Sequence, residues 1–341
     1  MSEDVLIPFE HYATSNCETG VMHNLMHHNG LRISENLLFG IGSGLYFIYF
    51  PFIQMGSEGP LTSYRHAPGS ILKNGSKKLG VNFEIQTFKN AEESMKALDE
   101  KLYQGIPVGL TGDLYEFEVF PEFVNFHFNN HNLVVYGKES DEYLISDPIV
   151  ETPIRMHADV LKRARYVKGA KDNPKGKMYW LSSVDNQQLP IENAIKGGLT
   201  LTYKRMLNPF FPFGGVKGIK RLAKKLKTYP QKKSPEYVNT HLTNMIRHQE
   251  IVGSGGSGYR KQFAAFLEEA AAITNNRGMA EISEQIKEEL SPAWRDYSIS
   301  MARCARAKLD KAQDKFDALS EELYNIGVKE YQIFNQIKKA L

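Results

Sequence analysis

Hydrophobic residues recur at helical spacing near the start of the chain and again around residue 100. The first predicted helix runs from about Cys17 to Asn29, where Asn29-Gly30 favours its end. Its apolar face is formed by Val21, Met22, Leu25 and Met26. A second short helix is expected to start at Ser34-Glu35 and run into Gly40, and residues 91–104 form a third.

Several short β-prone runs accompany these helices. They lie at residues 45–52, 106–110, 132–137, 143–146 and 177–181. The clearest pair is NLVVYG (132–137) and 143–146, which the charged turn 138–142 joins into a hairpin. Beyond about residue 155 helical patterns dominate, and the last 60 residues predict two or three bundled helices. We therefore expect an α+β fold with a domain at 1–155 and a mainly helical domain at 156–341.

Composition agrees with two packed domains. The chain has 341 residues, 42% of them hydrophobic and 24% charged, which excludes a mainly disordered, collagenous or membrane-embedded protein. The sequence MSEDVLIPFE lacks the pattern of a secretory signal, so we expect a cytoplasmic protein. Two cysteines, Cys17 and Cys304, are too few for a disulfide framework or a cysteine-based metal site.

The charge is unevenly distributed. The formal net charge of +3 is too small to indicate a nucleic-acid partner. Residues 217–233 nevertheless hold eight basic and no acidic residues, so the rest of the chain has a formal charge of −5. This segment should attract an acidic macromolecule. Nucleic acid or an anionic membrane surface would be attracted to this segment too. On a membrane, Leu222, Ala223 and Leu226 would form the apolar side of an interfacial helix.

Cys17 is the candidate nucleophile. It stands at the start of the first helix behind Ser15 and Asn16, and the positive end of a helix dipole favours a thiolate. The alternative is a buried structural cysteine. The hairpin brings together the outer ends of its strands, where His131 could serve as the base and Asp147 as its orienting group. His127 is a competing base.

These residues carry a family resemblance. A cysteine opening a helix, followed by HNLVVYG (131–137), a polar loop and SDP (146–148), resembles the papain-like fold of the C39-type cysteine peptidases. The run from Asn16 to Pro51, with the hairpin and the GSGGSGYR segment, resembles the butirosin biosynthesis protein H family. That resemblance implies a papain-like domain followed by a helical domain of undefined function. Carried over by position, it makes Cys17 the nucleophile, His131 the base and Asp147 the orienting group.

The resemblance also implies an activity. A member of this family would move an acyl or aminoacyl group from the phosphopantetheinyl thioester of an acyl carrier protein to an amine, or less commonly a hydroxyl, in natural-product biosynthesis. The cofactor arm would then arrive with the carrier, and we expect no permanently bound cofactor and no metal. Papain-like enzymes place an oxyanion-binding Gln six residues before the nucleophile, whereas this chain has His11. Either His11 or the backbone N–H of Cys17 could donate to the oxyanion. His11, Asn16 and Glu35 are the residues expected to support the site.

Two basic or glycine-rich segments are candidates for carrier binding. GSGGSG (253–258) leads into a helix whose N-terminus, with Arg260, could hold the phosphate of phosphopantetheine through Gly255 and Gly256. The competing interpretation is a flexible linker. The basic segment would steer an acidic carrier. Its candidate contacts are Lys220, Arg221, Lys224 and Lys225.

Two other functions remain open at this stage. With water as the acceptor, the same three residues would form a peptidase, an amidase or a thioesterase. If the three side chains lay too far apart to hydrogen-bond, a non-catalytic binding protein would be favoured. The sequence leaves the acyl group, the acceptor and the oligomeric state open.

Overall fold

The structure is a computed structural model that describes residues 4–54, 59–117, 127–167, 174–185 and 188–341. The chain forms two compact units. One comprises residues 1–38 and 79–189, and the other comprises residues 39–78 and 190–341. This division differs from the expected boundary at residue 155, because the strand at 178–184 pairs within the sheet of the first unit and the hairpin at 45–65 packs on helices of the second.

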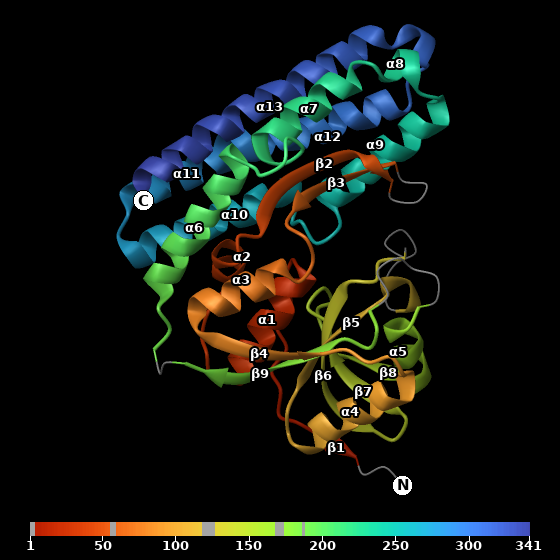
Figure 1. Ribbon diagram of the computed structural model, residues 1–341, viewed down its shortest axis with the longest axis vertical. Coiled ribbons are helices and arrows are strands. Elements are labelled where there is room, and N and C mark those ends of the chain that lie inside the picture. Colours follow the sequence, from red (N-terminus) through yellow and green to blue (C-terminus); the bar gives the residue numbers. More distant parts are fainter. Residues whose placement is uncertain (1–3, 55–58, 118–126, 168–173, 186–187) are drawn as a thin grey trace. The chain divides into compact units, whose positions relative to one another are not determined.

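The first unit is built on a seven-stranded antiparallel sheet (Figure 1). Its strands are β1 (Val5–Leu6), β4 (Val81–Gln86), β5 (Val108–Gly112), β6 (His131–Glu139), β7 (Glu142–Ser146), β8 (Ile154–His157) and β9 (Met178–Val184). The strand order is β4-β9-β5-β6-β7-β8, and β1 adds to β6. The predicted hairpin is confirmed as β6 and β7, in which Val134 lies opposite Ser146.

Helices cover both faces of this sheet. They are α1 (Cys17–His28), α4 (Ala91–Tyr103), α5 (Ala158–Arg165) and the short 3-10 helix η2 (Leu114–Glu116). Alternate strand residues such as Leu110, Leu133 and Ile145 form one hydrophobic core with α4 and α5. The intervening residues face α1, as Asn132 and Ser146 do through hydrogen bonds to α1 side chains. The active cysteine proposed from the sequence therefore lies on the opposite face of the sheet from α4.

The second unit is mainly helical. It contains the hairpin β2 (Leu45–Gln54) and β3 (Pro60–Arg65), and α2 (Glu35–Ile41) leads into it from the first unit. Its helices are α3 (Ser70–Leu79), α6 (Ile191–Leu207), α7 (Gly215–Leu226), α8 (Tyr229–Lys232), α9 (Pro235–Glu250), η4 (Ser257–Tyr259), α10 (Arg260–Thr274), α11 (Arg277–Gln285), η5 (Ile286–Leu290), α12 (Ser291–Ala305), η6 (Leu309–Lys311) and α13 (Gln313–Ala340). The long α13 packs along α6, α7 and α12 (Figure 1).

The expected fold class, α+β with a mainly helical second part, is confirmed by this arrangement. The first predicted helix, at 17–29, is α1 at Cys17–His28, and the predicted strand at 45–52 is β2. Within the described ranges, no helix has the length and apolar character needed to cross a membrane.

Candidate active site

Cys17 is the first residue of α1, where the local sequence fixes the helix start. The Asn16 side chain accepts hydrogen bonds from the backbone N–H groups of Glu18 and Thr19, at 3.0 and 3.1 Å. This is an N-cap, and it leaves the cysteine at the positive end of the helix dipole. The thiol is free of any disulfide and largely buried.

His131 and Asp147 meet at the outer end of the β6–β7 hairpin. The Nε2 of His131 donates to Oδ2 of Asp147 at 2.6 Å, and both side chains are buried. The second carboxylate oxygen of Asp147 accepts from the backbone N–H of Ile149 at 3.0 Å. The carboxylate is therefore held on both sides, and its partner imidazole has a fixed ring orientation.

Cys17 completes the group, since its side chain is hydrogen-bonded to His131. Because Nε2 of His131 bonds to Asp147, Nδ1 is the ring nitrogen that remains for the hydrogen bond to the Cys17 sulfur. Burial opposes a charged imidazole, but the charge and hydrogen bond of Asp147, with a smaller contribution from Cys17, outweigh it and raise the pKa of His131 to about 10. The imidazolium that this favours is the natural counter-ion of a thiolate.

A small residue lets α1 approach the hairpin closely enough for this contact. A Cβ at Gly20 would lie 2.5 Å from Cβ of Pro148 and 2.1 Å from Oγ1 of Thr14. Any larger residue at this position would push α1 away from the Asp147-Pro148 end of β7. Gly20 thus sets the distance between the helix that carries the cysteine and the strand end that carries the aspartate.

Asn132 and Tyr179 also belong to the site, although sequence reasoning missed both. The Nδ2 of Asn132 lies 3.7 Å from the Cys17 sulfur, and its Oδ1 accepts from the Tyr179 hydroxyl at 2.8 Å. Burial, with the nearby charges of Glu18 and Cys17, raises the pKa of Tyr179 far above its usual value, so the hydroxyl stays a donor. Gly109 leaves room for the Tyr179 ring, which would lie 2.5 Å from a Cβ there. The sequence could have indicated Asn132, because it directly follows the candidate base His131. Nothing in the sequence indicated Tyr179.

Glu35 supports the start of α1, as expected. Its carboxylate accepts from the backbone N–H of Asn16 at 2.9 Å, from that of Ser15 at 3.2 Å and from the hydroxyl of Thr19 at 2.8 Å. Glu35 and Asn16 therefore hold the same turn from two sides. Both act through the backbone that places Cys17.

His11 supports the site but does not face the thiol as an oxyanion donor would. Its Nε2 donates to the carbonyl of Val150 at 3.0 Å, and its Nδ1 accepts from the hydroxyl of Ser146 at 2.7 Å. Both ring nitrogens of His11 are thus engaged by neighbouring residues, so of the two donors that the sequence left open the backbone N–H of Cys17 is the better placed. The contacts of His11 fix residues on both sides of Asp147.

The competing base, His127, has an acid of its own. Its Nδ1 lies 2.7 Å from Oδ2 of the buried Asp113, and its ring stacks on Tyr115. Asp113 also accepts from the backbone N–H of Phe128 at 2.8 Å. Of the two histidines, the one whose pKa is coupled to Cys17 is His131.

Comparison with known proteins identifies the family. Residues 16–148 match the family model described as butirosin biosynthesis protein H, N-terminal, and residues 159–337 match a domain of unknown function, DUF4872. The chain belongs to the butirosin biosynthesis protein H family. All three members of the Cys17, His131 and Asp147 group lie within the first matched segment.

Other comparisons add little to this assignment. The chain is similar to a solved structure described as a C39-like peptidase from Bacillus anthracis, with 15% identity and a TM-score of 0.36 over 54% of this chain and 100% of that one. No curated protein matches the chain. Family membership therefore rests on the two family models.

The glycine-rich segment of this family member does not form a phosphate site. Gly256 donates its N–H to Oγ of Ser254, and the N–H of Ser257 donates to the Glu250 carboxylate at 3.2 Å. Arg260 is fully buried, and its Nε donates to Glu330 at 2.7 Å. The Ser254 hydroxyl and the Glu250 carboxylate thus occupy the N–H groups of Gly256 and Ser257, and Glu330 holds the arginine. The predicted phosphate contacts of Gly256 and Arg260 are contradicted, and that of the exposed Gly255 stays a prediction. A flexible linker is contradicted as well, because Ser254 and residues 256–260 are buried.

The basic residues predicted for carrier binding lie on α7 in the second unit. Arg221, Lys224 and Lys225 are exposed, and Lys220 is half-buried with its ammonium 5.0 Å from the centre of the Tyr324 ring. The apolar face of the same helix, including Leu222, Ala223 and Leu226, is buried in the protein. The helix therefore cannot lie with that face in a membrane, as the sequence had allowed.

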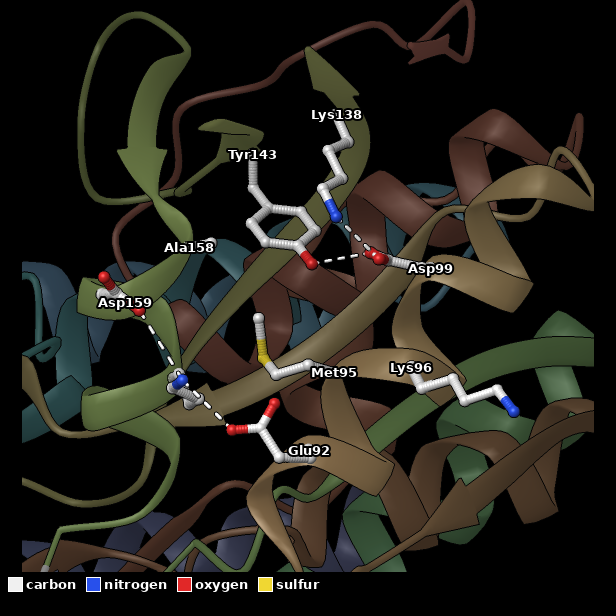
Figure 2. Close-up of a pocket in the computed structure, with 9 residues that line it drawn as sticks. Glu92, Met95, Lys96, Asp99, Lys138, Tyr143, Ala158 and Asp159 are labelled. Carbon is white, nitrogen blue, oxygen red and sulfur yellow. Dashed lines mark hydrogen bonds and ion pairs between the residues drawn. The ribbon is translucent and has the colours of Figure 1, made fainter. Parts of the chain in front are cut away.

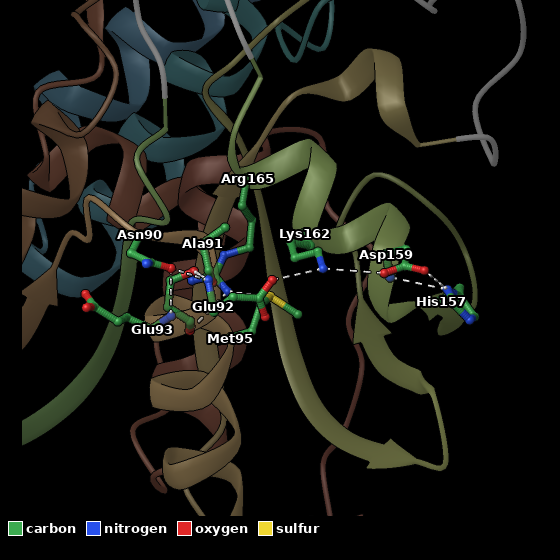
Figure 3. Close-up of polar contacts among 10 residues, drawn as sticks. Asn90, Ala91, Glu92, Glu93, Met95, His157, Asp159, Lys162 and Arg165 are labelled. Atoms are coloured by element: carbon green, nitrogen blue, oxygen red, sulfur yellow. Dashed lines mark hydrogen bonds and ion pairs between the residues drawn. The ribbon is translucent and has the colours of Figure 1, made fainter.

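A cavity of about 310 Å³ lies elsewhere in the first unit, between α4, α5 and the far end of β6. Figure 2 shows Lys138 and Tyr143 both directed at Asp99, with distances of 2.7 and 2.6 Å. Figure 3 shows Lys162 placed between Glu92 and Asp159. Lys138 and Lys162 are thus paired with acids at this cavity, and none of Cys17, His131 and Asp147 lines it. We assign it a structural role in joining α4 to α5.

Among the described residues, no cluster of His, Cys, Asp and Glu side chains could hold a metal ion.

Proposed function

We propose that this protein is an acyltransferase that moves an acyl or aminoacyl group from the phosphopantetheinyl thioester of an acyl carrier protein to an amine. The observation that carries the proposal is the hydrogen-bonded series Cys17, His131 and Asp147 in a member of the butirosin biosynthesis protein H family. The family resemblance supports transfer from a carrier. The bonded geometry argues against a binding protein without catalysis, which would not need a thiol beside a charged imidazole.

The chemistry proceeds in two steps. The Cys17 thiolate attacks the thioester carbonyl, and the phosphopantetheine sulfur leaves with the proton of the His131 imidazolium. An acyl-Cys17 thioester and free carrier result. The acceptor amine then attacks this thioester, neutral His131 takes the amine proton, and the Cys17 thiolate leaves as an amide forms. A hydroxyl acceptor would give an ester by the same steps.

The negative oxygen of each tetrahedral intermediate needs donors that papain-like enzymes take from a Gln side chain. Asn132 supplies a side-chain N–H near the sulfur, and the helix start supplies the backbone N–H of Cys17. The Asn132 nitrogen donates to the carbonyl of Asn130 at 2.9 Å and to the Cys17 sulfur at 3.7 Å. When the sulfur attacks the thioester, the N–H that faced it turns to the new oxyanion, and we assign Asn132 this role.

Trapping of the covalent intermediate tests the proposal. Acetyl and glycyl thioesters of N-acetylcysteamine mimic the end of the phosphopantetheine arm. Intact-mass measurement should show one acyl group on the wild-type protein, located on the peptide that contains Cys17. An added amine, such as glycine ethyl ester, should discharge it as an amide. Cys17→Ala should lose acylation and at least about 1000-fold of the turnover.

Cys304→Ala is the matched control, because the chain has only these two cysteines. Cys304 is buried, and burial raises the pKa of its thiol to about 11, so it should stay unacylated and its removal should leave turnover unchanged. Discharge by water as fast as by amine would instead indicate a hydrolase. Wild-type turnover in Cys17→Ala would overturn covalent catalysis.

A further inference from the structure

Five phenylalanines gather on one surface of the second unit. Phe50 and Phe52 lie on β2, and Phe210, Phe211 and Phe213 lie between α6 and α7. Their ring centres are 5.6 Å apart for Phe50 and Phe213, 5.0 Å for Phe52 and Phe213, and 4.8 Å for Phe210 and Phe211. We call these five residues the aromatic patch.

Much of the aromatic patch is open to solvent. The exposed fraction is 92% for Phe210, 64% for Phe52 and 53% for Phe211, and the neighbouring Ile53 is 41% exposed. Contiguous apolar surface of this kind on a protein usually marks an interaction site. The exposed rings include two consecutive phenylalanines that stand between prolines, in the sequence NPFFPF (208–213).

Backbone contacts hold the patch in place. The N–H of Tyr49 donates to the carbonyl of Phe213 at 2.9 Å, and Ile48 forms a β-bridge with Gly214. The loop that carries three of the phenylalanines is therefore tied to the strand that carries the other two. These bonds fix the backbone that carries the rings.

Positive charge adjoins the patch. Helix α7 begins directly after the loop, and the Arg221 guanidinium lies 4.6 Å from the centre of the Phe213 ring. Lys217, Arg221 and Lys224 are exposed on the side of α7 opposite its buried face, at helical spacing. No acidic residue occurs between 217 and 233. Exposed rings and cations therefore share one surface.

We propose that the aromatic patch and the basic face of α7 bind the surface of an anionic lipid bilayer. Phenylalanine rings enter the boundary between headgroups and acyl chains, while lysine and arginine contact lipid phosphates and carboxylates. An acidic protein partner fits less well. A side chain that is 92% exposed would need a matching pocket in a rigid partner, whereas a fluid bilayer accepts it without one. The loop that carries Phe210 and Phe211 enters the bilayer. Helix α7 does not, because its apolar face is buried in the protein.

Vesicle sedimentation with the full chain tests this inference. The wild type is expected to bind vesicles of phosphatidylcholine and phosphatidylserine in a roughly 7:3 ratio, and to bind pure phosphatidylcholine at least about tenfold more weakly. Salt should weaken the binding, because the charges are exposed. Phe210→Ser/Phe211→Ser and Lys217→Glu/Arg221→Glu should each lower it at least about tenfold.

Two matched variants control for general surface effects. Ile273→Ser/Ile299→Ser removes two exposed apolar side chains of α10 and α12, and Lys89→Glu/Lys96→Glu reverses two exposed charges of the first unit. Both should bind like the wild type, and circular dichroism should show all variants folded.

Four outcomes would overturn the inference. The first three are no vesicle binding by the wild type, equal binding to both vesicle types, and loss of binding in the control variants, and the fourth concerns the charge variant. If Lys217→Glu/Arg221→Glu slowed transfer from a loaded carrier protein but left vesicle binding intact, the surface would belong to the carrier. A protein that binds vesicles but fails to form acyl-Cys17 would contradict only the proposed function.

Discussion

At the scale of single residues, the site depends on a histidine whose charge is set by its neighbours. His131 is buried, which by itself favours the neutral ring, yet it lies between the Asp147 carboxylate and the Cys17 sulfur. The same protein contains a second pair, His127 with Asp113, in which the histidine is largely exposed. The two pairs provide an internal comparison of the same chemistry with and without a thiol.

Asp147→Asn is expected to lower the pKa of His131. Removing the carboxylate leaves burial as the largest influence, so the pKa should fall from about 10 by roughly 1–3 pH units. Less imidazolium then faces the sulfur, and alkylation of Cys17 by iodoacetamide at neutral pH should slow. NMR titration of the histidine and alkylation rates measure the two effects. Asp113→Asn is the matched control and should leave the pKa of His131 in place.

The same shift predicts how stability depends on pH. The folded-state pKa of His131 is raised from 6.5, so its contribution to the free energy of unfolding is complete below pH 6.5 and is lost as pH rises through about 10. The free energies of unfolding of Asp147→Asn and the wild type should therefore differ most at the acid end of the range from pH 6.5 to about 10. A difference in urea stability that grew between pH 6.5 and 10 would contradict the assigned sign.

At the scale of elements, the first turn of α1 is held by residues before it and beyond it. Asn16 caps the helix, and Glu35, the first residue of α2, accepts from two backbone N–H groups and the Thr19 hydroxyl. Gly20 allows the helix to approach Pro148. The cysteine is thus placed by contacts of its helix with α2 and with the end of β7.

Glu35→Gln should destabilise this turn. The amide keeps one acceptor but loses the charge and turns donors toward the N–H groups, so we expect a loss of about 1–2 kcal/mol in the free energy of unfolding. Cys17 alkylation should slow as well, because the helix start moves. Glu93→Gln is the control, since Glu93 is an exposed acid in the first turn of α4. Equal effects of the two substitutions on alkylation would show that Glu35 does not place the cysteine.

At the scale of the whole molecule, each unit has a core of its own. The first unit is built on an apolar core, and the second buries an ion pair. The second unit buries Arg260 and Glu330 completely, and Trp294 donates to the same carboxylate oxygen at 2.8 Å. This network joins α10, α12 and α13. It also explains why Arg260 is unavailable to a phosphate.

Glu330→Gln is expected to destabilise the protein by about 3–5 kcal/mol, because it leaves the Arg260 charge buried without its counter-ion. Asp317→Asn breaks the pair of Asp317 with Lys227, which are partly exposed and 3.6 Å apart, and should cost less than about 1 kcal/mol. Urea unfolding measures both. A small effect of Glu330→Gln would mean that Arg260 finds another partner.

The features of this protein that depend on local pattern could be predicted from its residues alone. Helical spacing and a capping residue located α1 and placed Cys17 at its start, and strand pairing across a short turn brought His131 to Asp147. Each of these follows from residues close together in the chain, or from one hairpin.

Tertiary structure decided what depends on distant residues. Tyr179 on β9 reaches Asn132 on β6 across β5, the strand that pairs with both, although 47 positions separate the two residues. Glu250 accepts from the N–H of Ser257 and Glu330 from Arg260, two donors that a phosphate would have needed. His11 likewise turned to Val150, 139 positions away. Whether a donor is available for a ligand depends on which acceptor the fold has already brought to it, and no local pattern records that.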